Sequence, residues 1–182
     1  MQPTPAEPRH RDHSIHGAYG FEQVVHHRRE PYERVGRRRK AALLHLRAWG
    51  GTGRGRCCQH PMVDDHACDQ PGMDNPKYRM WNLRTNRLVW KAYLSGGANP
   101  DIAVPARRAD LSGLAPAWLG VGTLDPLFTE GIEYARRLVE FGVPCDVDTV
   151  RGAFHGFDAV APSAPVSRAF FERQCEVLQQ YL

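Results

Sequence analysis

The feature that most constrains the fold is a succession of three segments between residues 117 and 150. Residues 117–122 (Ala-Trp-Leu-Gly-Val-Gly) form a short apolar run after Pro116, which is typical of a buried strand. Residues 146–150 alternate polar and apolar side chains, as a second strand would. A strand, a helix and a strand of this length predict a βαβ unit with parallel strands and a right-handed crossover. We therefore expect an α/β fold.

The segment between these two strands has the pattern of an amphipathic helix. Thr129 is a candidate N-cap, and Glu130 and Glu133 lie in the expected first turn, where the helix dipole favours anions. Gly142 is placed to adopt the left-handed conformation that ends a helix. One face of this helix is apolar and should pack on the sheet: Ile132, Ala135, Leu138 and Val139.

Two chemically capable side chains follow the two predicted strands. Asp125 lies in the turn after the first strand, where Pro126 favours an extended or turn conformation, and His155 follows the second strand. Ligands of parallel sheets bind outside the carboxyl ends of the strands. A carboxylate at that edge can fix the tautomer of an imidazole and make it a general base. The spacing alone is equally compatible with an N-capping aspartate and a solvated loop histidine.

Several further motifs occur in a fixed order along the last two thirds of the chain. They are His60-Pro61-Met62-Val63-Asp64-Asp65, Trp81, Trp90, Pro105-Ala106-Arg107, residues 110–116 (Asp-Leu-Ser-Gly-Leu-Ala-Pro), the Asp125 and His155 motifs, and a closing amphipathic helix that should start near Ser163 and bury Val166, Phe170, Val177 and Tyr181. In these motifs the chain resembles the hormone-sensitive-lipase branch of the α/β-hydrolases, the fold-3 esterases, over about residues 60–182. The family has Tyr-Pro-Met-Leu-Asp-Asp where this chain has its His-Pro-Met-Val-Asp-Asp segment.

The resemblance implies a partial α/β-hydrolase fold, with the C-terminal parallel strands of the sheet and their flanking helices. It also implies a carboxylic ester hydrolase that acts on small-molecule esters, with Asp125 as the triad acid and His155 as the base. The family needs no metal and no dissociable cofactor, and we expect none here. Its nucleophile is a serine in G-x-S-x-G, upstream of the position of Pro61, and its Gly-rich oxyanion loop lies further upstream.

The chain departs from the family at the nucleophile. None of its serines has glycine two residues before and two residues after it: Ser14, Ser95, Ser112, Ser163 and Ser167. Residues 16–20 (His-Gly-Ala-Tyr-Gly) are a weak echo of the oxyanion loop, without its consecutive glycines. We therefore expect little or no ester hydrolysis from this chain. With the upstream strands absent, the strand at 117–122 should expose an unpaired edge, through which copies of the chain could associate.

Residues 1–59 differ in composition from residues 60–182. The first 60 residues hold twelve Lys and Arg, five Asp and Glu, and seven of the nine histidines. We consider three interpretations: a basic arm that is disordered alone and binds nucleic acid or acidic partners, a solvated surface of an ordinary domain, and an irregular segment translated out of frame. The Arg, Gly, His and Pro enrichment favours the third, and the alternative function is a non-catalytic binding protein that uses this arm.

A loose group of metal-capable side chains lies near the junction of these two segments: Cys57, Cys58, His60, His66 and Cys68. Adjacent cysteines fit tetrahedral zinc poorly, because zinc sites use C-x-x-C or H-x-x-x-H spacing, so we expect no metal site. The sequence contains no window of eighteen apolar residues, so we expect no transmembrane helix. The N-terminus lacks the apolar core of a signal peptide. From these features we expect a cytoplasmic protein.

Overall fold

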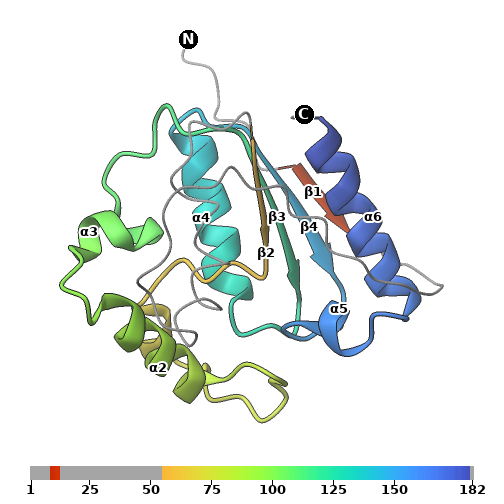
Figure 1. Cartoon of the computed structure of the whole chain (residues 1–182), viewed down its shortest axis with the longest axis horizontal. Coiled ribbons are helices and arrows are strands. Elements are labelled where there is room, and N and C mark those ends of the chain that lie inside the picture. The colour runs from red at the N-terminus through yellow and green to blue at the C-terminus, as the bar shows by residue number, and fades with distance from the viewer. Residues whose placement is uncertain (1–8, 13–54, 181–182) are drawn as a thin grey trace, which may run out of the picture.

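The computed structural model describes residues 9–12 and 55–180. They form a parallel sheet with the strand order β1-β4-β3-β2, covered by helices (Figure 1). The strands are β1 (Arg9–Asp12), β2 (Arg56–Gln59), β3 (Ala117–Gly122) and β4 (Cys145–Val150). The α-helices are α2 (Leu83–Leu94), α3 (Pro100–Ala103), α4 (Phe128–Glu140), α5 (Phe157–Val160) and α6 (Pro165–Gln179), and the short 3-10 helices are η2 (Ala67–Asp69) and η3 (Pro105–Arg107).

The predicted βαβ unit is confirmed as β3, α4 and β4. The two strands are parallel and in continuous register from Ala117 opposite Cys145 to Gly122 opposite Val150. Gly142 has the expected positive φ of 76° and ends the helix.

The start of α4 differs from the prediction. Its N-cap is Leu127 and not Thr129, because the side chain of Asp125 starts the helix earlier. Its Oδ1 atom accepts a hydrogen bond from the backbone N–H of Leu127 at 2.9 Å, and its carbonyl accepts one from Phe128 at 3.0 Å. The residue that the site depends on is thus also the residue that turns the chain into α4.

β3 is not an edge strand, so the expectation of an unpaired edge there is wrong. β2 pairs with it in parallel, from Arg56 opposite Ala117 to Gln59 opposite Gly120. Arg56 is buried, and its guanidinium donates from Nε and Nη2 to the carbonyl of Ala115 at 2.9 and 2.6 Å. The neighbour of β3 is therefore β2, which belongs to the basic segment 1–59. β2 stands at one end of the described sheet.

The core has a layer on each face of the sheet. Helix α4 packs on one face, where Tyr134, Ala135 and Leu138 meet inward side chains of the strands such as Leu119 and Val147. Helix α6 covers the other face (Figure 1): Phe170 and Val177 pack with Trp118 and Val150. Leu119 and Trp118 are consecutive in β3, so their burial in different layers follows from the alternation of a strand.

The closing helix broadly follows its prediction. It begins at Pro165, two residues after Ser163, and proline suits the first position of a helix, where its missing N–H costs nothing. Phe170 and Val177 are buried as expected, and Val166 is half-buried against the same cluster. Tyr181, Ser14, residues 16–20 and the basic run 28–40 lie outside the described residues.

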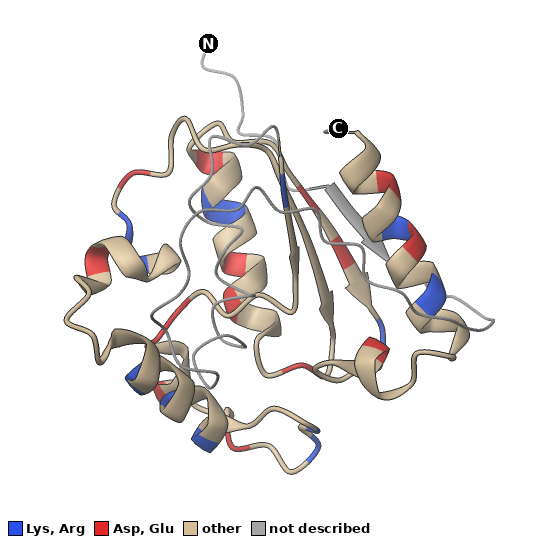
Figure 2. Ribbon diagram, viewed as in Figure 1, with Lys and Arg blue, Asp and Glu red and all other residues tan. Residues whose placement is uncertain are grey.

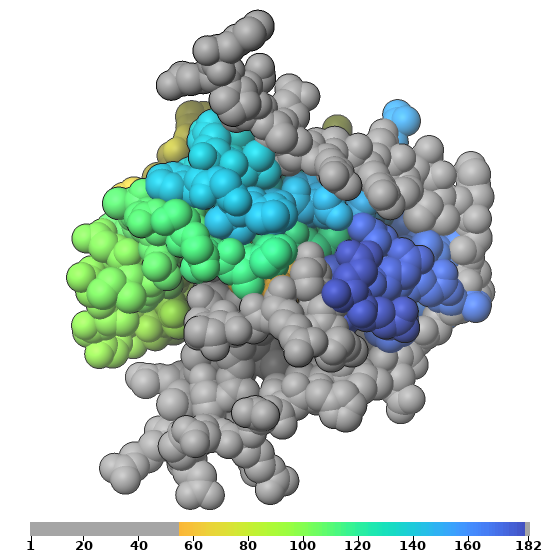
Figure 3. Space-filling view, turned by 90° about the horizontal axis from the view of Figure 1, so that it is seen from above, coloured from red at the N-terminus to blue at the C-terminus, as the bar shows by residue number. Residues whose placement is uncertain are grey.

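A third cluster joins α2 to the rest of the molecule. Trp90 of α2 packs with Met62, Cys68, Val104 and Leu127. The segment of α2 and α3 and helix α6 lie at opposite ends of the face seen in Figure 3.

Acidic and basic residues are interspersed along α4 and α6 (Figure 2), and on α4 Arg136 pairs with Glu133 and Glu140. In the described ranges, no helix combines the length and apolar character that crossing a membrane requires.

Candidate functional site

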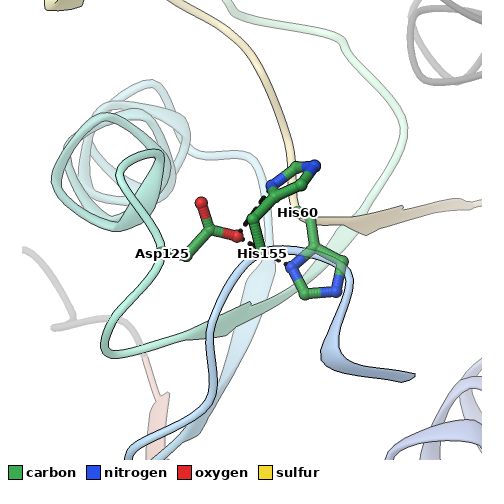
Figure 4. Close-up of side chains that lie close together, drawn as sticks. All are labelled: His60, Asp125 and His155. Atoms are coloured by element: carbon green, nitrogen blue, oxygen red, sulfur yellow. Dashed lines mark hydrogen bonds and ion pairs between the residues drawn. The ribbon is translucent and has the colours of Figure 1, made fainter. Parts of the chain in front are cut away.

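Asp125 is the centre of the candidate site. It follows β3 in the turn that leads into α4, and its side chain has no exposed area. While Oδ1 accepts from Leu127, Oδ2 faces two imidazole rings (Figure 4). Burial alone would raise the pKa of Asp125, but hydrogen bonds from His155 and His60 lower this pKa to about 2. Asp125 is therefore a buried carboxylate anion at neutral pH.

His155 lies where the sequence predicted it, in the turn between β4 and α5. Its Nδ1 atom is 3.0 Å from Oδ2 of Asp125, and its side chain is 12% exposed. The ring of Trp81 lies over it, with ring centroids 4.8 Å apart and planes inclined by 35°. A carboxylate accepts only from an N–H, so Asp125 places the proton of a neutral His155 ring on Nδ1 and the basic lone pair on Nε2.

His60 is the third member of the site, and its place there was not predicted from the sequence. It follows β2 with a φ of 46° and is buried. Its Nδ1 is 2.9 Å from the same Oδ2 of Asp125, and its Nε2 is 3.1 Å from Oδ1 of Asp158. Burial lowers the pKa of His60, but the hydrogen bonds to the two carboxylates outweigh it and raise this pKa to about 9. The ring is therefore a cation at neutral pH, donating from both nitrogens.

The sequence grouped His60 with nearby cysteines, and the structure separates them. Cys57 and Cys58 lie within β2 and Cys68 within η2, whereas His66 is exposed beside Arg107. In residues 55–180, the metal-capable side chains that gather are instead His60, Asp125 and His155, whose ligand atoms lie within 4.8 Å of one another. One signal could have found His60: it ends a strand parallel to β3, so it reaches the same edge of the sheet.

Other residues singled out by sequence lie outside this cluster and make local contacts. Asp65 accepts two hydrogen bonds from Arg107, at 2.8 and 2.6 Å, and Asp64 accepts the N–H of His66 at 2.9 Å, so this acidic pair braces its loop. Among the described serines, Ser95 donates to the carbonyl of Ala92 at 2.8 Å, and Ser167 is buried without a hydrogen-bond partner for Oγ.

Comparison with known proteins settles the family. The sequence model of the alpha/beta hydrolase fold matches residues 40–159. This chain belongs to the alpha/beta hydrolase fold family. The resemblance to the fold-3 branch and the partial hydrolase fold that the sequence predicted are thereby confirmed. In this alpha/beta hydrolase, Asp125 and His155 lie in loops at the carboxyl edge of a parallel sheet.

Solved esterases share this architecture. Esterase LipW from Mycobacterium marinum superposes with a TM-score of 0.63 at 26% identity, covering 79% of this chain and 45% of that protein. A bacterial heroin esterase superposes with a TM-score of 0.62 at 30% identity, covering 79% of this chain and 47% of that protein. In sequence, the chain is 34% identical over 68 residues to esterase LipI of Mycobacterium tuberculosis, covering 37% of this chain and 21% of LipI.

This alpha/beta hydrolase chain spans about half the length of these solved esterases. The family match begins at residue 40, so it includes the last twenty residues of the basic segment 1–59, with β2 among them. The described residues therefore supply an oriented histidine and its carboxylate. They include no serine in the G-x-S-x-G context that would complete a triad.

Proposed function

We propose that Asp125 and His155 are the acid and the base of a carboxylic ester hydrolase site. The observation that carries this proposal is the 3.0 Å hydrogen bond between His155 Nδ1 and the ionised carboxylate of Asp125. In acyl transfer from an ester to water, His155 Nε2 would take the proton of the nucleophile, and Asp125 would stabilise the imidazolium that results. Small-molecule esters are the substrate class, in keeping with the esterases that the chain resembles.

We propose further that this chain alone has little or no such activity. Removal of a triad nucleophile lowers turnover on the order of a million-fold, which leaves only what binding and oxyanion stabilisation provide. No serine of the chain stands between the two glycines of a nucleophile elbow. The pair is then the retained half of a catalytic site.

Hydrolysis of a short-chain p-nitrophenyl ester and labelling by a fluorophosphonate probe test this proposal in the full chain. We expect no stoichiometric labelling, and the same low rate for the chain, for His155→Ala and for the matched variant His66→Ala. His66 is 64% exposed and lies outside the Asp125 cluster. Turnover that disappears in His155→Ala alone would show that another nucleophile completes the site, and stoichiometric labelling of a serine would identify it.

The charge of residues 1–60 supports a second candidate function, a non-catalytic binding protein. This stretch holds twelve Lys and Arg against five Asp and Glu. If it contacts the phosphates of a nucleic acid, binding must weaken steeply with added salt, because phosphate contacts release counterions. Fluorescence anisotropy of a labelled duplex and a labelled single strand, titrated at low and high salt, distinguishes this function: absence of binding at low salt excludes it.

A further inference from the structure

We propose that His60, Asp125 and His155 form a binding site for a divalent transition-metal ion of the zinc type. The three side chains come from the ends of three adjacent parallel strands, β2, β3 and β4, and converge at one edge of the sheet (Figure 4). Two imidazoles and one carboxylate are a ligand set that zinc, cobalt and iron bind in proteins, with further positions left for water or a ligand.

The nitrogens of the two rings already lie close to one carboxylate oxygen. His60 Nδ1 and His155 Nδ1 lie 2.9 and 3.0 Å from the same oxygen, Oδ2 of Asp125. Two ligands of a tetrahedral zinc ion at about 2.0–2.1 Å would lie about 3.3 Å apart. To admit the ion, each nitrogen moves away from the oxygen by about 0.3–0.4 Å, and the ring nitrogens, which lie within 4.8 Å of each other, also approach to about 3.3 Å.

The remaining polar atoms of His60 and Asp125 make hydrogen bonds of the kind that orient ligands in metal sites. The other nitrogen of His60, Nε2, is 3.1 Å from the carboxylate of Asp158, and the other oxygen of Asp125 accepts the N–H of Leu127 at 2.9 Å. Histidines that bind metals typically donate their second N–H to a carboxylate or carbonyl, which fixes the ring and its tautomer. Asp158, in the first turn of α5, occupies this supporting position behind His60.

The charge of the cluster also fits a cation. Two carboxylates, those of Asp125 and Asp158, face the ring of His60, and both are at most 13% exposed. On coordination, the His60 Nδ1 proton leaves to solvent, and the His155 proton moves from Nδ1 to Nε2. Two neutral rings, two carboxylates and one divalent ion then sum to zero charge in a buried site, where an unbalanced charge would be costly.

A metal ion at this position would replace the Asp125–His155 hydrogen bond, so the metal-bound chain and the oriented acid–base pair are alternative states of the same residues. The sequence predicted no metal site from Cys57, Cys58 and their neighbours, and it did not group His60 with Asp125 and His155, which are spread over nearly a hundred positions. Metal binding by these residues does not depend on whether the chain hydrolyses esters.

Titration of the full chain with Zn²⁺ by calorimetry, and with Co²⁺ by visible absorption, tests the site. Six further histidines precede residue 46 and can also bind metal, so the test rests on variants. We expect one Zn²⁺ whose affinity falls at least about 100-fold in His60→Gln and His155→Gln and about 10–100-fold in Asp158→Asn. The matched variant His66→Gln should bind as the unmodified chain does.

The Co²⁺ absorption bands of a low-symmetry nitrogen and oxygen site should disappear with His60→Gln. Far-UV circular dichroism checks that each variant folds, and where His60→Gln does not fold, His155→Gln and Asp158→Asn decide in the same way. The proposal is overturned if these variants keep the stoichiometry and bands of the unmodified chain, because the ion is then held elsewhere. It is equally overturned if the chain binds no Zn²⁺ at millimolar concentration.

Discussion

At the scale of single residues, Glu130 of α4 holds the loop that follows His60 against this helix, which begins just after Asp125. Its Oε1 accepts the backbone N–H groups of Val63 at 2.6 Å and Asp64 at 3.2 Å, while Oε2 is buried without a partner. Burial raises the pKa of Glu130 from 4.5 to about 8, against the lowering effect of these two hydrogen bonds. A carboxylic acid whose pKa is higher in the folded state binds its proton more tightly there than when unfolded.

Glu130 should therefore make the chain less stable as pH rises. Its contribution is fully present below the unfolded pKa and is lost as pH rises through the window from 4.5 to about 8. Glutamine keeps an oxygen for the two N–H groups and does not titrate, so Glu130→Gln should be more stable than the unmodified chain above pH 8 and nearly equal to it below pH 5. Urea unfolding at both pH values measures this, with Glu133→Gln on the exposed side of the same helix as control. Parallel pH dependence of the chain and Glu130→Gln would contradict it.

At the scale of elements, the turn that carries His155 lies directly against the end of β3. A Cβ atom on Gly122 would lie 2.2 Å from the carbonyl oxygen of Ala153, which is backbone and cannot move aside alone. Leu124 donates to this same carbonyl at 2.9 Å, so the Asp125 turn and the His155 turn are fastened to each other.

Gly122→Ala should destabilise the chain by about 1–3 kcal/mol, because the added methyl group forces the two turns apart. Gly96→Ala is the matched control: no atom lies within 4 Å of its new Cβ, and its effect should stay within about 0.5 kcal/mol. Chemical denaturation measures both variants. Equal stability of Gly122→Ala and the unmodified chain would mean that the two turns are not in close contact.

Helix α6 is fastened to the sheet by an ion pair between a half-buried arginine and a buried aspartate. Arg173 Nε donates to Oδ2 of Asp148 at 2.7 Å, and the same oxygen accepts the indole N–H of Trp118 at 2.5 Å. Arg173→Met leaves the carboxylate of Asp148 in the core without its cation, which should cost about 3 kcal/mol. Glu176→Gln removes only an exposed partner of Arg173 and should cost less than about 1 kcal/mol. Similar losses in the two variants would show that Asp148 is not held by this arginine.

The elements could be predicted from sequence to different extents. β3, α4 and β4 are local in sequence and carry clear periodicity, so their order, direction and the placement of Asp125 and His155 followed from pattern alone. β2 has four residues, one of them an arginine whose burial depends on the distant carbonyl of Ala115, and no local pattern reports such pairing. His60 was missed for the same reason, since its place beside Asp125 is fixed by β2 pairing with β3.

At the scale of the whole molecule, the chain is a sheet of parallel strands between two helical layers, with its candidate site at one edge. It covers 45–47% of the length of the solved esterases described above, and it holds the pair that we propose as acid and base, Asp125 and His155, without a G-x-S-x-G serine. β2 stands at one end of the described sheet, so we propose β2 as the edge through which two copies would associate. Analytical ultracentrifugation tests this: a strictly monomeric chain at high micromolar concentration would contradict it.

The proposed acid–base pair requires that Asp125 holds the ring of His155 in one tautomer. The tautomer can be measured in metal-free protein by two-bond ¹H–¹⁵N correlation spectroscopy of the histidine rings. At a pH where the His155 ring is neutral, we predict its proton on Nδ1, hydrogen-bonded and shifted downfield, and a change of this signal in Asp125→Asn. The signal is assigned by its loss in His155→Gln, and the exposed His66 serves as the reference ring. A proton on Nε2 of His155, or a spectrum that does not respond to Asp125→Asn, would contradict the acid–base pair.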